Sequence, residues 1–239
     1  MKIEIIPCLK DNYSYLVIDE KENTACVIDP SESDPIIKYL EKNKINLKFI
    51  LNTHHHFDHV GGNKNLKEKY RAKVIGFKED KKRIPEIDIL VDDQEIWKCD
   101  NFEAKIVHVP GHTRGHVYFY FYNQKSVFTG DTLFSLGCGK IFEGTYSQMF
   151  NSLKKIKELP LETKIFCGHE YTLNNSKFCI SHDKDNKKLK SKIIEIEKKL
   201  RDHLPTIPST IKEELECNIF LKSENVEAFS KLRDLKDNF

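Results

Sequence analysis

Hydrophobic and polar residues alternate in short runs along most of this chain, which is the pattern of β-strands with one buried face. Three such runs, at residues 3–6, 13–19 and 25–28, are separated only by polar turns at 11–12 and 21–23. Strands joined by turns this short predict an antiparallel meander. The further strands that the pattern predicts cover residues 48–51, 73–76, 89–91, 95–98, 102–109, 117–122, 126–129 and 164–167.

Hydrophobic residues at helical spacing interrupt the strands in several places. After the break at Asp29-Pro30, the positions of Ile36, Ile37 and Leu40 predict a helix over residues 34–43. The same reasoning places helices at about 62–70, 147–157, 187–203 and 225–235. Strands mixed with single helices indicate the α/β class, and the last two amphipathic patterns indicate helices near the C-terminus.

Composition narrows the classes of function. The 39 Lys and Arg residues against 37 Asp and Glu leave a formal net charge of +2, so no overall field favours nucleic acid or an anionic membrane. The first seven residues alternate charged and apolar side chains, unlike a signal peptide, and no segment reaches membrane-spanning length. The seven cysteines are scattered without a C-x-x-C pair, which favours a reducing compartment, the cytoplasm. A chain of 239 residues suits one large domain, or one domain with a smaller appendage.

A cluster of histidines follows the predicted strand at 48–51. Residues 53–59 read Thr-His-His-His-Phe-Asp-His, and two glycines stand at 61 and 62. Strand ends are where α/β architectures place ligands. His54 and His56 are two positions apart in an extended turn and can meet one ion, whereas His55 points away. Asp58 and His59 can meet a second ion. The alternative is a solvated histidine-rich loop, which does not explain the strand before the tract or the glycines after it.

Three more polar residues follow predicted strands and stand next to a glycine: His112, Asp131 and His169. Each alone has an ordinary explanation, as a turn residue, a helix N-cap or a buried histidine. Together with the first cluster they complete two half-sites. We expect one metal ion at His54, His56 and His112, a second at Asp58, His59 and His169, and Asp131 as the bridge between them. Two ions that share a carboxylate activate water for hydrolysis.

These residues resemble the metal-binding motifs of the metallo-β-lactamase superfamily, at 53–59, 111–113, 129–132 and 167–171. Residues 137–140, 142–145, 168–172 and 205–210 further resemble the glyoxalase II family within it. The resemblance runs along nearly the whole chain. It implies the α/β fold class, with residues 1–172 forming a four-layer αββα sandwich. A dinuclear metal site would lie at one edge of that sandwich. It also implies a small C-terminal α-helical domain over residues 173–239 that binds substrate.

The resemblance implies a substrate as well. The family hydrolyses S-D-lactoylglutathione to D-lactate and glutathione, the second step of methylglyoxal detoxification. The residues that match its glutathione contacts are Lys140, Tyr171, Arg233 and Lys236. Arg233 and Lys236 are three positions apart, share a helical face, and match the family's site for the glycine carboxylate. Phe142 departs from the pattern, because the family commonly has tyrosine there, and the chain ends soon after the basic pair.

The expected reaction is metal-dependent thioester hydrolysis, with Asp58 as the catalytic residue that orients the attacking hydroxide. The expected cofactors are two divalent ions, zinc first and iron or manganese as alternatives, because His and carboxylate ligands accept all three. The expected partner is a small-molecule glutathione thioester, and the expected state is a monomer. Two alternatives remain: a persulfide dioxygenase of the same superfamily, which uses one iron, and an inactive relative that binds glutathione conjugates. The pair of His59 and His169, with Asp131 between them, favours two ions.

Overall fold

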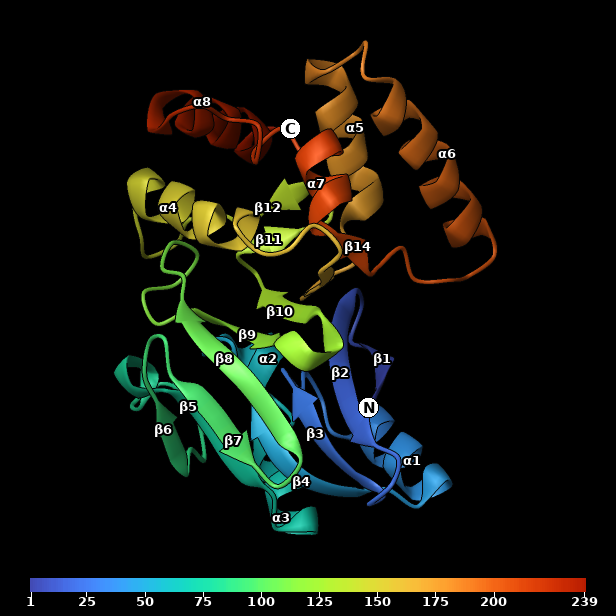
Figure 1. The fold of residues 1–239 in the computed structure, drawn as a ribbon, viewed down its shortest axis with the longest axis vertical. Helices are drawn as coiled ribbons and strands as arrows, with labels where there is room; N and C mark the ends of the chain where they lie inside the picture. Colours follow the sequence, from blue (N-terminus) through green and yellow to red (C-terminus); the bar gives the residue numbers. More distant parts are fainter. The chain divides into compact units, whose positions relative to one another are not determined.

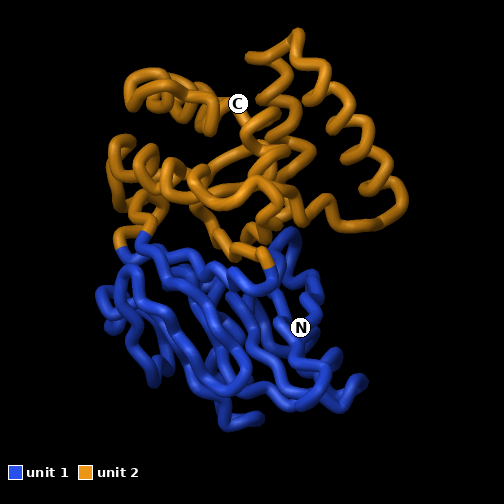
Figure 2. The backbone as a smooth tube through the Cα atoms, viewed as in Figure 1, with its two compact units in different colours: residues 1–108, 115–124 blue, residues 109–114, 125–239 orange.

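The computed structural model describes residues 1–239, which divide into two compact units (Figure 2). Unit 1 comprises Met1–His108 and Gly115–Gln124. Unit 2 comprises Val109–Arg114 and Lys125–Phe239. Residues 109–114, which include His112, therefore belong to unit 2, although the chain returns to unit 1 for residues 115–124. From residue 125 onward the chain belongs to unit 2.

Unit 1 contains a six-stranded sheet in the order β1-β2-β3-β4-β5-β6 (Figure 1). Its strands are β1 (Lys2–Cys8), β2 (Asn12–Asp19), β3 (Thr24–Ile28), β4 (Asn46–Leu51), β5 (Lys73–Phe77) and β6 (Ile89–Val91). The first three pair antiparallel, which confirms the predicted meander, and the last three continue parallel to β3. Because β3, β4 and β5 are parallel, their carboxyl ends meet at one edge of the sheet.

Two helices cover one face of this sheet. The first, α1 (Asp34–Asn43), lies between β3 and β4, and α3 (Asn63–Tyr70) lies between β4 and β5. Pro35 and Asp34 suit the first turn of α1, and Lys44 ends it in the left-handed region at φ 56°. Ile36, Leu40 and Leu66 are fully buried against the sheet, and burying one such side chain contributes about 1.5–3 kcal/mol. The predicted helices at 34–43 and 62–70 are confirmed.

Strands of a second sheet pack on the other face of the first within unit 1. They are β7 (Ile96–Cys99), β8 (Phe102–His108) and β9 (Val117–Phe121), which pair antiparallel in that order. Phe49 of β4 meets Trp97 and Phe102 edge-on, with ring centroids 5.2 and 6.0 Å apart. Trp97 is 3% exposed. Unit 1 is thus layered as helices, sheet and sheet.

Unit 2 contains short strands and most of the helices (Figure 1). β10 (Ser126–Gly130) pairs parallel with β13 (Lys164–Cys167), β14 (Ser209–Thr210) pairs antiparallel with β13, and β11 (Leu133–Phe134) forms a hairpin with β12 (Gly137–Cys138). The helices are α4 (Tyr146–Lys157), α5 (Thr172–His182), α6 (Lys187–Arg201), α7 (Ile211–Cys217) and α8 (Val226–Asp237).

Side chains at the helix starts explain where several of these helices begin. Thr145 and Gln148 form a reciprocal capping box at α4, and Thr210 and Glu213 form another at α7. Asn225 accepts a hydrogen bond from the third residue of α8. The predicted helices at 147–157, 187–203 and 225–235 are confirmed as α4, α6 and α8. The elements α5, α7, β14, the β11–β12 hairpin and the single-turn helix α2 (Phe57–Val60) were not predicted.

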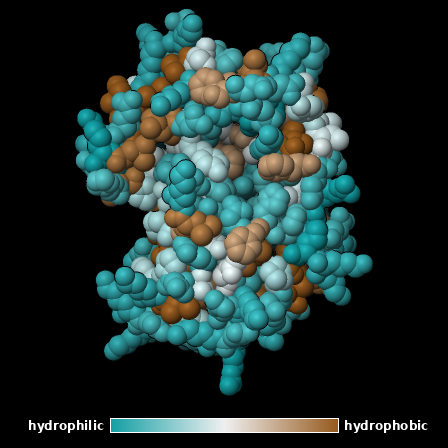
Figure 3. Space-filling view, turned by 180° about the vertical axis from the view of Figure 1, so that it is seen from behind, coloured by the Kyte–Doolittle hydropathy of each residue, from teal (hydrophilic) through white to brown (hydrophobic).

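The exterior is mainly hydrophilic on the face drawn in Figure 3, with scattered hydrophobic side chains. No helix has the length and apolar character that crossing a membrane requires. The seven cysteines form no disulfide. Burial raises the pKa of Cys167 and of Cys179 to about 12, so these thiols are protonated at neutral pH.

Candidate metal centre and substrate residues

The histidine tract of unit 1 leaves the end of β4 and enters the single turn of α2. His54 and His59 are fully buried, while His56 and Asp58 are partly exposed. The ring of His54 lies 4.7 Å from that of His56 and 4.2 Å from that of His59, measured between centroids. Within unit 1 the structure therefore brings together the histidines that the sequence singled out.

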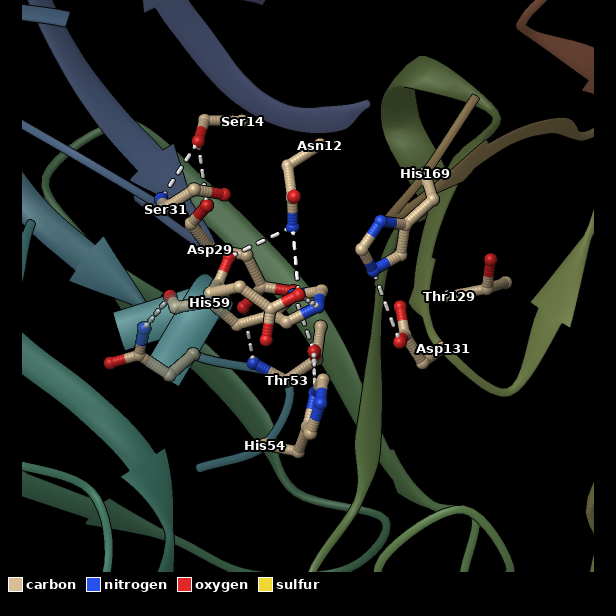
Figure 4. Close-up of polar contacts among 12 residues, drawn as sticks. Asn12, Ser14, Asp29, Ser31, Thr53, His54, His59, Thr129, Asp131 and His169 are labelled. Carbon is tan, nitrogen blue, oxygen red and sulfur yellow. Dashed lines mark hydrogen bonds and ion pairs between the residues drawn. The ribbon is translucent and has the colours of Figure 1, made fainter. Parts of the chain in front are cut away.

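Asp29, directly after β3, is hydrogen-bonded to Thr53 and His59 of this cluster (Figure 4). Its Oδ1 accepts from Thr53 N (2.7 Å), and its Oδ2 accepts from Thr53 Oγ1 (2.6 Å) and from His59 Nδ1 (3.0 Å). A carboxylate only accepts hydrogen bonds, so His59 carries its proton on Nδ1 and the lone pair on Nε2. The Thr53 hydroxyl donates its single proton to Asp29, so its oxygen accepts a hydrogen bond from His54 Nδ1 at 3.0 Å. His54 is thereby set to the same tautomer.

Asn12 orients the carboxylate of Asp58. Its Nδ2 lies 3.0 Å from Asp58 Oδ2 and 3.1 Å from the Asp58 carbonyl oxygen, so one amide group holds both the side chain and its backbone. Asp58 Oδ2 lies 3.7 Å from His59 Nε2. The two potential ligands of one half-site are thus adjacent within unit 1.

His55 lies on a different network. Its Nδ1 is 3.2 Å from Oδ2 of the fully buried Asp80, and its Nε2 is 3.4 Å from Arg83 Nη1. Arg83 also donates to Asp80 through Nε at 3.0 Å. Both ring nitrogens of His55 therefore face Asp80 and Arg83, as its omission from the metal ligands requires.

Unit 2 contains the other three predicted ligands, His112, Asp131 and His169. Asp131 Oδ2 lies 3.5 Å from His112 Nε2 and 3.3 Å from His169 Nε2, the latter contact drawn in Figure 4. His112 Nδ1 donates to the carbonyl oxygen of Lys140 at 2.8 Å, which leaves its lone pair on Nε2. Gly139 is required beside them, because a Cβ there would lie 1.8 Å from the Asp131 carbonyl oxygen.

These side chains fit divalent metal ions. Histidine ligands in metal sites hold their second nitrogen in a hydrogen bond that fixes tautomer and ring orientation, as Asp29, Thr53 and Lys140 do here. Two atoms bound to one tetrahedral ion at 2.0–2.1 Å lie roughly 3.3 Å apart. The separations from Asp131 Oδ2 to the two histidine nitrogens match this spacing.

Two of the predicted substrate residues lie near the candidate metal ligands of unit 2. Tyr171, which is 38% exposed, stacks on His169 with ring centroids 4.7 Å apart and planes 3° from parallel. Lys140 is exposed, and its Nζ lies 6.0 Å from the ring centre of Phe142. Phe142 is 62% exposed and meets His112 edge-on at 5.2 Å, so the position that lacks the family's hydroxyl still lies beside a predicted metal ligand.

Arg233 and Lys236 share a face of α8 but have different surroundings. Arg233 is 5% exposed, donates from Nη1 to the Cys138 carbonyl oxygen at 2.7 Å and from Nη2 to Asp237 at 2.9 Å. Lys236 is partly exposed, and its Nζ makes no hydrogen bond within the protein. That ammonium lies against the rings of Phe178 and Phe239, and burial together with the charge of Arg233 lowers the pKa of Lys236. Because it donates to the Cys138 carbonyl oxygen, Arg233 also links α8 to β12.

Sequence reasoning missed Asp29 and Asn12, which orient the predicted ligands. A signal for Asp29 was present. It follows β3 directly and precedes Pro30, so it occupies the same kind of strand end as the histidine tract after β4. No comparable signal marks Asn12, which begins β2.

Comparison with known proteins identifies the family. Residues 10–169 match the family model described as the metallo-beta-lactamase superfamily, and residues 170–239 match the one described as the hydroxyacylglutathione hydrolase C-terminus. The hydroxyacylglutathione hydrolase of Pelagibacter ubique is 74% identical over 239 residues, all of both chains.

Solved structures agree on the fold. ETHE1 from Myxococcus xanthus has a TM-score of 0.74 at 22% identity, over 98% of this chain and 90% of that one. TTHA1623, solved in a di-iron-bound form, has a TM-score of 0.59 at 27% identity, over 71% of this chain and 92% of that one. The predicted α/β sandwich with a small helical C-terminal region is confirmed. The chain belongs to the hydroxyacylglutathione hydrolase family of the metallo-β-lactamase superfamily.

Proposed function

We propose that this protein is a metal-dependent thioester hydrolase that cleaves S-D-lactoylglutathione, and related 2-hydroxyacylglutathiones, to the hydroxy acid and glutathione. The observation that carries the chemistry is the set of hydrogen bonds that fixes three histidines in one tautomer. Oxygens of Thr53, Asp29 and Lys140 hold the Nδ1 atoms of His54, His59 and His112, so that each presents Nε2 as a metal ligand. The full-length similarity to a hydroxyacylglutathione hydrolase supports the substrate.

We propose two divalent ions per chain. His54, His56 and His112 would hold one, Asp58, His59 and His169 the other, and Asp131 would contact both. The spacing around Asp131 Oδ2 supports its bridging role, and the di-iron form of a related structure supports the count. Zinc is our first choice, and iron or manganese suit the same ligands.

Bound ions of this kind lower the pKa of water and polarise a carbonyl oxygen. The protein's own part is orientation. Asp58, which Asn12 holds by two hydrogen bonds, would orient the attacking hydroxide toward the thioester carbon. Thiolate is a good leaving group, so no side-chain acid is needed to protonate the departing sulfur.

The glutathione part of the substrate would lie on unit 2. Lys236 has an ammonium nitrogen that is buried and makes no hydrogen bond inside the protein, and a carboxylate would supply the missing partner. Arg233 contributes a second positive charge from the same face, while Lys140 and Tyr171 are exposed beside the metal ligands of this unit. We propose that these four residues bind glutathione.

We further propose a catalytic domain at 1–172 and a substrate-binding domain at 173–239. The meeting of the two family models between residues 169 and 170 supports that division. We also propose a monomer that works in the cytoplasm. The absence of disulfides among seven cysteines supports a reducing compartment.

The test combines metal analysis of purified protein with thiol release from S-D-lactoylglutathione. We expect about two ions per chain, preferential loss of one in His169→Ala, and a kcat in Asp58→Asn that falls far more than KM rises. One ion with oxygen uptake on glutathione persulfide would replace this proposal with a persulfide dioxygenase. Tight binding of glutathione conjugates without turnover in the metal-loaded protein would identify a binding protein instead.

A further inference from the structure

We infer that Thr206 is a positioning residue for this reaction, because its hydroxyl fixes Glu170 and, through Glu170, the turn that carries His169 and Tyr171. The inference rests on the proposed function, in which His169 binds metal and Tyr171 contacts substrate. All the residues involved belong to unit 2.

Thr206 holds both oxygens of the Glu170 carboxylate. Its backbone N–H donates to Oε2 at 2.8 Å, and its Oγ1 donates to Oε1 at 2.6 Å. Thr206 is 1% exposed, so the contact is shielded from water on its side. Short hydrogen bonds to a carboxylate are about twice as strong as neutral ones, and two parallel bonds also fix its plane.

The same hydroxyl reaches the start of α5. Thr206 Oγ1 lies 2.6 Å from Thr172 Oγ1, and Thr172 is also 1% exposed. A hydroxyl has one proton, which Thr206 gives to Glu170, so Thr172 donates to Thr206. The hydroxyl oxygen of Thr206 is therefore hydrogen-bonded to the side chains of both Glu170 and Thr172, the two neighbours of Tyr171.

The fastened turn carries both functional side chains. His169 Nε2 lies 3.3 Å from Asp131 Oδ2, and Tyr171 stacks on the same imidazole with ring centroids 4.7 Å apart. Phe134 meets both rings edge-on, at 5.9 Å from His169 and 5.3 Å from Tyr171. A shift of the Glu170 backbone would move a metal ligand and a substrate contact together.

Thr206 is itself well anchored to the strand that leads into this turn. Ser209 and Thr210, which follow it closely, pair as β14 with Ile165 and Lys164 of β13. Lys199 Nζ lies 3.4 Å from the Thr206 carbonyl oxygen. The segment at 205–210, conspicuous in the sequence, thus fastens the His169 turn to the strand from which it emerges.

The test uses Thr206→Val, which has nearly the same shape and keeps the backbone bond to Glu170 but removes both hydroxyl contacts. Removing a group that hydrogen-bonds directly to a metal ligand typically costs ten- to a hundredfold in metal affinity or activity, and Thr206 acts one residue further away, so the lower end of this range applies. We expect about a tenfold weaker hold on metal in chelator competition and about a tenfold lower kcat/KM for the glutathione thioester. Thr206→Ser keeps the hydroxyl and should restore both.

Thr210→Val is the matched control, because Thr210 caps α7 and its hydroxyl is hydrogen-bonded to Glu213. It should lower the melting temperature but leave metal affinity and kcat/KM unchanged. A double variant Thr206→Val with Glu170→Gln should be no worse than the worse single variant, since both changes break the same link.

Amide hydrogen exchange provides a readout that does not depend on metal or activity. Exchange in peptides covering 168–172 should rise in Thr206→Val, return in Thr206→Ser and stay at the wild-type level in Thr210→Val. Unchanged exchange in Thr206→Val, or metal affinity within twofold of wild type, would overturn the positioning role. Wild-type protein without metal or thioesterase activity would instead contradict the proposed function, and the exchange result would still decide this inference.

Discussion

Asp29→Asn changes one atom of the group that orients the unit 1 histidines, and the structure shows why this should matter. Asparagine fits the backbone, because Asp29 has φ 49° and asparagine tolerates this left-handed region well. Its amide, however, has one acceptor and one donor group where the carboxylate has two acceptors. If nitrogen faces Thr53 N, two donors oppose each other. If nitrogen faces His59 Nδ1, that ring must move its proton to Nε2, the atom that would bind metal.

Either orientation loses at least one hydrogen bond to a charged group, worth about 1.5–3 kcal/mol. If that loss falls on the metal-binding tautomer of His59, it corresponds to roughly ten- to a hundredfold weaker metal binding at about 1.4 kcal/mol per decade. This agrees with the usual effect of removing an outer-shell carboxylate. The kcat of fully metal-loaded Asp29→Asn should fall less than its metal affinity, because Asp58 and its partner Asn12 are untouched.

The assay is competition with a chromogenic chelator, supported by elemental analysis of the dialysed protein. Asp19→Asn is the matched control. Asp19 is another buried aspartate of unit 1, accepts hydrogen bonds from Asn101 Nδ2 (2.6 Å) and Lys21 N (3.0 Å), and none of these residues belongs to the histidine cluster. It should lose stability without losing metal. Equal metal affinity in wild type and folded Asp29→Asn would refute the argument from tautomers.

The remaining predictions concern pH, stability and metal removal. Because the pKa of Lys236 is lowered by burial and by Arg233, kcat/KM should fall as pH rises through that lowered pKa, and Lys236→Arg should move the fall to higher pH. Burial raises the pKa of Glu214, so the folded state keeps this proton to higher pH than the unfolded state and the free energy of unfolding falls as pH rises from the ordinary glutamate range. Urea unfolding of Glu214→Gln should lack that part of the fall. Thr145→Ala removes the α4 cap and should cost about 1 kcal/mol by the same measurement, with activity retained. Removing metal with a chelator should lower the melting temperature, and re-addition at about 100 times the dissociation constant should restore about 2.7 kcal/mol.

Sequence patterns predicted the elements whose buried residues are apolar and regularly spaced. The helix at 34–43 was identified because Ile36 and Leu40 lie on one face, and both are fully buried. Helix α5 was missed because its buried residues include Thr172, Asn175 and Ser176, so no apolar stripe marks it. Asn175 is buried because it donates to the Ser135 carbonyl oxygen, a contact that a hydrophobicity pattern does not record.

Helix α7 is too short to show a helical period, since it has seven residues. Its capping box, Thr210 with Glu213, was nevertheless visible in the sequence as the signature of a helix start. Attention to capping residues, and not only to periodicity, would have identified it.

The candidate ligands were identifiable because each follows a strand and stands near a glycine. Their supports were not, because the partners are far apart in sequence: Asp29 holds Thr53 over 24 positions and Asn12 holds Asp58 over 46. The shared face of Arg233 and Lys236 is correct, yet spacing alone did not indicate that Arg233 is buried against the Cys138 carbonyl oxygen. Such contacts depend on the tertiary arrangement.

Trp97 gives this protein a built-in optical probe. It is the only tryptophan of the chain, and it is buried between the two sheets of unit 1 against Phe49. Its fluorescence therefore reports on sheet packing in unit 1, whereas the far-ultraviolet circular dichroism at helical wavelengths comes mainly from the helices of unit 2. Following both signals through one denaturation experiment reveals whether the two units unfold together or one after the other.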